Sequence, residues 1–182
     1  SAILILFLCN LAFGSNSSAP KYSAVVVDAN TRDILFAESE GKRLHPAGLT
    51  KLMTLYVAIK AIENGEIGLD DKVIISNHAA AEAPVKLGLR GGQKARLRYL
   101  IRAAGVEGSN DAATAIAEHI EGSEAAFARR MNRTAEALGM TGSTFRNAHG
   151  LTETGQLSTA QDMAILLLAL NEEFPDYFNL FG

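Results

Sequence analysis

The chain has 182 residues, of which 48% are hydrophobic and 20% are charged. That balance excludes an intrinsically disordered tail, which would contain fewer apolar and more charged residues. The 17 basic and 20 acidic side chains give a formal net charge of −3, which argues against a dedicated nucleic-acid-binding protein. The length suits one domain with a buried core.

An apolar segment, Ala2–Leu8, opens the chain and resembles the central region of a secretory signal peptide. Small residues at positions 12 and 14 predict cleavage after Gly14. We therefore expect residues 1–14 to be a leader, and the protein to be exported to the periplasm or cell envelope of a bacterium. A buried N-terminal helix or strand is the alternative. The single cysteine, Cys9, falls in this leader, so the remainder has no disulfide.

The first elements predicted after the leader are two strands. Tyr22–Asp28 and Asp33–Glu38 flank a turn, which predicts a β-hairpin. From Leu49 onward the apolar residues follow helical spacing, and Asn64-Gly65 is expected to end that helix. Val73–Ile75 is a short apolar segment, which we expect to be extended.

The second half of the chain is predicted to be mostly helical. The expected helices are Leu97–Val106, Asp111–Ile120, a helix that Ser123 caps and that runs to Leu138 before Gly139, and Met163–Leu170 after a capping box at 158–161. A polar loop is expected over residues 147–156. The predicted class is therefore α+β, with an N-terminal hairpin and a mainly helical body.

The predicted hairpin lacks further strands, because no convincing strand follows about residue 76. A two-stranded hairpin is only marginally stable by itself. It therefore either packs on helices only, or belongs to a sheet whose other strands lie beyond Gly182.

Chemistry is suggested by the segment His45-Pro-Ala-Gly-Leu-Thr-Lys51. Gly48 and Lys51 lie three residues apart at the start of the predicted helix, so they share one face. A nucleophile at 48 would have the amine of Lys51 within reach as its base. Backbone N–H groups at the helix N-terminus would also favour acyl transfer. This is the spacing of the S-x-x-K motif, with glycine in place of serine.

Six motifs support a resemblance to one enzyme family. They are H-P-A-x-L-T-K-L-M-T at 45–54, L-G-L-R-x-G at 87–92, S-N-D-A-A at 109–113, L-G-M-T at 138–141, H-G-L at 149–151 and L-S-T-A-x-D at 157–162. In these motifs and their order, the chain resembles the D-alanyl-D-alanine carboxypeptidases, the low-molecular-mass penicillin-binding proteins. The resemblance implies that residues 15–182 are part of a β-lactamase/transpeptidase-like fold, without the later strand that carries K-T-G. It also implies a serine acyl-enzyme and the D-Ala-D-Ala end of peptidoglycan stem peptides as substrate.

The resemblance gives roles to four positions, two of which have lost their side chain. Lys51 would be the general base, and Asn110 would contact the substrate amide. The family has serine where this chain has Gly48, the nucleophile position, and Gly108, the second-motif position. Gly48 cannot form an acyl-enzyme, and Gly108 cannot relay a proton to the leaving amine. Because K-T-G is absent as well, we expect the chain to be inactive in acyl transfer, and β-lactams to be partners only if serine is restored at 48.

Neighbouring hydroxyl groups are not expected to replace the missing serines. Thr50 points roughly 100° away from Lys51 around the helix, and Ser109 breaks the spacing to Asn110. Taken alone, Lys51 could be a solvated lysine and Asn110 a helix N-cap.

The sequence also leaves a different class of function open. A non-catalytic peptidoglycan-binding pseudoenzyme or scaffold is the alternative. A β-lactamase of the same superfold is disfavoured, because its S-D-N signature is missing. We expect no cofactor and no nucleic-acid partner, and no metal because the four histidines show no ligand spacing. Any membrane association would be peripheral and would use a region outside these residues.

Overall fold

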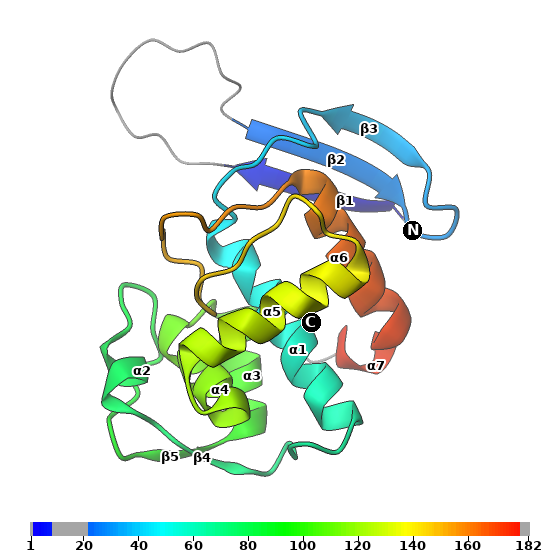
Figure 1. Cartoon of the computed structure of the whole chain (residues 1–182). Helices are drawn as coiled ribbons and strands as arrows, with labels where there is room; N and C mark the ends of the chain where they lie inside the picture. Colours follow the sequence, from blue (N-terminus) through cyan, green and yellow to red (C-terminus); the bar gives the residue numbers. More distant parts are fainter. Residues whose placement is uncertain (1, 9–21, 179–182) are drawn as a thin grey trace.

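The structure is a computed structural model, and it describes residues 2–8 and 22–178 (Figure 1). The strands are β1 (Ala2–Leu8), β2 (Tyr22–Asp28), β3 (Ile34–Glu38), β4 (Lys72–Ile74) and β5 (Lys94–Arg96). The helices are α1 (Thr50–Glu63), α2 (Asn77–Ala81), α3 (Leu97–Val106), α4 (Asn110–Glu121), α5 (Glu124–Leu138), α6 (Ala160–Glu173) and α7 (Pro175–Phe178). A single 3₁₀ turn, Ala47–Leu49, precedes α1. The predicted α+β class, with a mainly helical body, is confirmed.

The larger sheet has the order β1-β2-β3, with β2 in the centre and both neighbours antiparallel to it. The predicted hairpin is confirmed, and β3 begins at Ile34, one residue later than expected. The third strand is the N-terminal segment, whose pairing runs from Ala2 opposite Asp28 to Leu8 opposite Tyr22. The structure therefore contains a strand, Ala2–Leu8, within the segment that the sequence assigns to a leader. Cleavage after Gly14 falls outside the described residues and stays a prediction.

A second, two-stranded sheet joins β4 to β5, and its register places Lys72 opposite Arg96. The expectation that no strand follows about residue 76 is therefore wrong. The segment Lys94–Arg96 has too few apolar residues to show a strand pattern, so its pairing with β4 could not be predicted locally. Helix α2, which the sequence also did not predict, lies between these two strands along the chain.

Helix α1 forms the centre of the helical body and is buried over most of its length. Helices that are apolar on all sides belong in a protein interior, and α1 packs against α3, α4, α5 and α6. The alanine-rich α4 buries Ala112, Ala113 and Ala115, whose small side chains allow its neighbours to approach closely. Helix α6 packs against β2 and β1 on the face of the sheet that meets the helical body (Figure 1). None of the helices in residues 22–178 combines the length and hydropathy needed to cross a membrane.

The predicted helix ends are correct for α5 and displaced for α6. Ser123 Oγ accepts a hydrogen bond from the N–H of Ala126, and Gly139 ends α5 with a φ of 80°. The sequence placed the cap of the later helix at Ser158, but the N-cap is Thr159, whose side chain accepts from the N–H of Asp162. Ser158 Oγ lies 2.7 Å from Ser143 Oγ instead. A competing side-chain partner therefore moved the cap by one residue.

Candidate active site

A cavity of about 670 Å³ opens between the start of α1, the end of α3, the start of α4 and the loop at residues 149–152. The four positions singled out by the sequence, Gly48, Lys51, Gly108 and Asn110, all line it. Residues from two motifs about 60 positions apart therefore share one groove. The structure brings together the set that the family resemblance implied, although their roles stay predictions.

Lys51 lies in the first turn of α1 and is only 7% exposed. Its Nζ donates to Asn110 Oδ1 at 2.7 Å and to the carbonyl oxygen of His149 at 2.6 Å. Burial lowers the pKa of the Lys51 amine from 10.5 to about 8, because the charged form loses water. An amine with this pKa is partly neutral near physiological pH and can accept a proton. The interpretation of Lys51 as a solvated lysine is therefore wrong.

Asn110 is the first residue of α4, so the N-cap interpretation is also wrong: Ser109 holds the N-cap position. The side chain of Asn110 joins separate segments instead. Its Oδ1 accepts from Lys51, and its Nδ2 donates to the carbonyl oxygen of Ala83 at 3.1 Å. The backbone N–H of Asn110 donates to the carbonyl of Val85 at 2.8 Å. Asn110 thus fixes the amine of Lys51 relative to the chain segment that forms one wall of the groove.

The loop that carries His149 is held by buried side-chain amides. Gln156, which is 1% exposed, accepts from the N–H groups of Arg146 and Asn147 and donates to the carbonyl of Leu151. Thr54, one turn beyond Lys51 in α1, donates to the carbonyl of Ala148 at 2.6 Å. These bonds order the polar loop predicted for residues 147–156 and aim the carbonyl of His149 at the amine of Lys51.

Asp111 binds the backbone of residues 87–89, a role that the sequence motifs did not indicate. Its carboxylate is fully buried and accepts from the N–H groups of Leu87, Gly88 and Leu89 at 3.0, 2.9 and 3.0 Å. This explains physically why S-N-D-A-A and L-G-L occur together: the carboxylate of one motif binds the backbone of the other. The available signal was an aspartate directly after Asn110 at a helix N-terminus, where carboxylates are favoured.

No atoms crowd Gly48 and Gly108, the two positions at which the family has serine. A Cβ built on Gly48 or on Gly108 would have no other atom within 4 Å. Gly48 has no left-handed φ, so a side chain there would be accommodated without strain. Gly108 has a φ of 69°, where an L side chain costs roughly 1–2 kcal/mol. The groove therefore has room for a hydroxyl at 48, and it lacks one because of residue type rather than space.

The other two hydroxyl groups near the motif do not take the place of the serines in space. Thr50 is fully buried, and among the described residues its Oγ1 is a buried side-chain atom without a hydrogen-bond partner. Neither Thr50 nor Ser109 lines the cavity. Their positions agree with the sequence argument against a rescue by either residue.

His149 is 6% exposed, and its ring is bonded to the backbone of its own loop. Its Nδ1 accepts from the N–H of Leu151 at 3.1 Å, which leaves the ring proton on Nε2. Nε2 lies 3.5 Å from a carboxylate oxygen of Glu82 and 3.5 Å from one of Glu124. Burial lowers the pKa of His149, against the opposing effect of the two carboxylates. The backbone of this residue serves Lys51, and its ring faces a separate acidic cluster.

The family model described as D-alanyl-D-alanine carboxypeptidase matches residues 15–181. The chain belongs to this family. It is 38% identical to the D-alanyl-D-alanine carboxypeptidase DacF of Bacillus subtilis over 144 residues, which cover 79% of this chain and 37% of DacF. It is 37% identical to DacD of Escherichia coli over 166 residues, which cover 88% of this chain and 43% of DacD. The chain thus spans less than half the length of these two curated relatives.

Solved structures of a carboxypeptidase and of a penicillin-binding protein share the fold. The DacD carboxypeptidase of Francisella tularensis matches with a TM-score of 0.86 and 35% identity, covering 92% of this chain and 40% of the other. Penicillin-binding protein D2 of Listeria monocytogenes, in an ampicillin-bound form, matches with a TM-score of 0.78 and 28% identity, covering 87% and 64%. The resemblance inferred from six motifs is therefore confirmed at the level of family and fold.

Two glycines of the site have opposite steric demands, which predicts a contrast in stability. A Cβ at Gly150, whose φ is 91°, would overlap the carbonyl oxygen of Ala47, whereas a Cβ at Gly48 meets open space. Gly150→Ala should lower the free energy of unfolding by at least about 2 kcal/mol. The matched variant Gly48→Ala should change it by less than about 0.5 kcal/mol. Urea denaturation of both variants is the measurement, and equal effects would contradict this account of the H-G-L motif.

The buried amine of Lys51 predicts a pH-dependent contribution to stability. Unfolding returns its pKa from about 8 to 10.5, so between these values the unfolded chain binds more protons than the folded one. Over that interval the free energy of unfolding of the natural chain should therefore rise with pH relative to Lys51→Met. Below about pH 8 the difference between the two proteins should be flat. Urea denaturation of both across the interval tests this, and parallel pH profiles would show that the amine titrates normally.

Proposed function

We propose that this carboxypeptidase-family chain is directed at the D-Ala-D-Ala end of peptidoglycan stem peptides and does not catalyse acyl transfer. One observation carries the proposal: the amine of Lys51 is buried beside Asn110 in an open groove, while the nucleophile position is Gly48. The chain matches less than half of its curated relatives DacF and DacD, so the substrate is inferred from family membership.

The proposed inactivity follows from how acyl transfer distributes protons. A serine hydroxyl at 48 would give its proton to the amine of Lys51 as its oxygen attacks the peptide carbonyl carbon. Glycine has no oxygen to attack and no proton to give. A hydroxyl at 108 would help to pass a proton to the leaving D-alanine, and Gly108 has none. Because residues of a catalytic unit act together, loss of the nucleophile alone is enough to abolish turnover.

A second candidate is a non-catalytic peptidoglycan-binding protein or scaffold. The retained groove favours it: the hydrogen bonds of Lys51, Asn110 and Asp111 are all in place, and the cavity volume is about 670 Å³. If these residues served only to pack the core, the cavity that they line would not need to be open. By this proposal the protein acts in the bacterial cell envelope, and β-lactams are partners only if serine is restored at 48.

Turnover and binding of a stem peptide are tested together. We expect no release of D-alanine above a protein-free blank from a pentapeptide ending in D-Ala-D-Ala, and calorimetric binding of the same peptide. Asn110→Ala should weaken that binding at least about tenfold, since it removes a buried polar partner of the groove. Asn64→Ala, outside the cavity lining, is the matched control and should bind like the natural chain. D-alanine release would overturn the inactivity, and absence of binding would overturn the scaffold candidate.

A further inference from the structure

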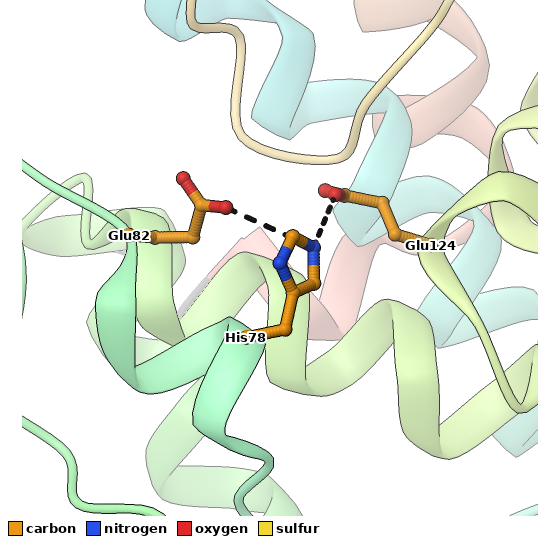
Figure 2. Close-up of side chains that lie close together, drawn as sticks. All are labelled: His78, Glu82 and Glu124. Carbon is orange, nitrogen blue, oxygen red and sulfur yellow. Dashed lines mark hydrogen bonds and ion pairs between the residues drawn. The ribbon is translucent and has the colours of Figure 1, made fainter.

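Beside the groove, three side chains from two segments of the chain converge on one point. His78 lies in α2, Glu82 directly follows that helix, and Glu124 is the first residue of α5 (Figure 2). His78 Nε2 lies 3.1 Å from Glu124 Oε2 and 3.8 Å from Glu82 Oε1. One ligand-type atom from each of the three residues lies within 4.8 Å of the other two. None of these residues belongs to the carboxypeptidase motifs identified above.

The two carboxylates need positive charge between them. Their side chains are only 15% and 13% exposed, so water screens their repulsion poorly. Each also has an oxygen 3.5 Å from Nε2 of the buried His149 ring. His78 contributes its ring from the solvent side, with a side chain that is 56% exposed. The cluster therefore presents two partly buried anionic oxygens and one imidazole nitrogen around a single solvent-accessible position.

The spacing of these atoms suits a metal ion. A tetrahedral zinc ion with bonds of about 2.0–2.2 Å holds its ligand atoms roughly 3.3–3.6 Å apart. The observed separations of 3.1 and 3.8 Å bracket that value. Three protein ligands leave a fourth position for water, which the exposure of His78 permits. A nitrogen ligand beside two carboxylates favours zinc-like transition metals over magnesium or calcium, which prefer oxygen ligands.

We propose that His78 Nε2, Glu82 Oε1 and Glu124 Oε2 form a binding site for one divalent transition-metal ion of the zinc class. The proposal is independent of whether the groove binds or cleaves a stem peptide.

The carboxylate oxygens that face away from this position are already held, as in established metal sites. Glu124 Oε1 accepts from the N–H of Ala148 at 3.0 Å and from Thr114 Oγ1 at 3.3 Å. Glu82 Oε2 lies 3.5 Å from His149 Nε2. These contacts orient both carboxylates before a metal arrives. The carbonyl oxygen of His149 accepts a hydrogen bond from Lys51. A metal ion would therefore link α2 and α5 to the loop that positions the amine of Lys51.

The test measures zinc binding to chelator-treated protein. Calorimetry and competition with a chromophoric chelator are the two readouts. The natural chain should take up one equivalent. His78→Gln, at an exposed position, should lose at least about tenfold in affinity. The matched control is His119→Gln, because His119 pairs with Asp71 at 3.3 Å and is not part of the cluster. It should bind zinc like the natural chain.

Two further measurements keep the outcome decisive. Glu124→Gln retains an oxygen that can accept from Ala148 while removing the anionic ligand, and it should also lose affinity. Far-ultraviolet circular dichroism in chelator should be the same for the natural chain and His78→Gln, so a loss of binding reports the site and not unfolding. No uptake by the natural chain, or equal affinity in His78→Gln, would overturn the proposal. Either result would leave a protonated His78 as the cation that neutralises the carboxylates.

Discussion

The groove depends on one buried interaction, in which the amine of Lys51 is shared between Asn110 Oδ1 and the carbonyl of His149. These two bonds join the start of α1, the start of α4 and the loop of His149, which lies 98 residues after Lys51. Burying an amine is unfavourable unless its protons are bonded, and the low pKa of Lys51 reflects the cost of that burial. This desolvation does not by itself stabilise the fold. It lowers the pKa of the Lys51 amine into a range where the amine can accept a proton, as acyl transfer requires.

The rest of the site is arranged to hold those three segments in place. Asp111 fixes the 87–89 segment through three backbone N–H groups, and Gln156 fixes the loop of His149. Gly150 lets that loop approach Ala47 more closely than any side chain would allow. These supporting contacts are therefore in place around Gly48, a position that has no side chain. The proposed loss of acyl transfer would leave them unaffected, because none of them uses a side chain at that position.

Local patterns were sufficient to predict the elements with strong periodicity or clear caps. Tyr22–Asp28 and Leu97–Val106 have the bounds that the sequence indicated, and Ser123 caps its helix as predicted. The charged strand Lys94–Arg96 was not predicted, and a strand at Ala2–Leu8 was only an alternative to a leader, because each exists only through pairing with a distant segment. Contacts between side chains that are distant in sequence were equally beyond local prediction.

The motif spacing predicted that Gly48 and Lys51 share a helix face, and the family resemblance added Gly108 and Asn110. Neither source could predict that His78 and Glu124, 46 residues apart, would meet beside them. That meeting depends on how α2 and α5 pack, which no local pattern contains.

Covalent capture of a penicillin tests most directly whether this groove keeps its base but lacks a nucleophile. The chain is incubated with ampicillin and its intact mass is measured, with penicillin-binding protein D2 of Listeria monocytogenes as the positive control. The absence of a side chain at Gly48 predicts an unchanged mass for this chain while the control gains one ampicillin. A stable ampicillin adduct on this chain would contradict the account, because it would require a nucleophile that the groove does not contain.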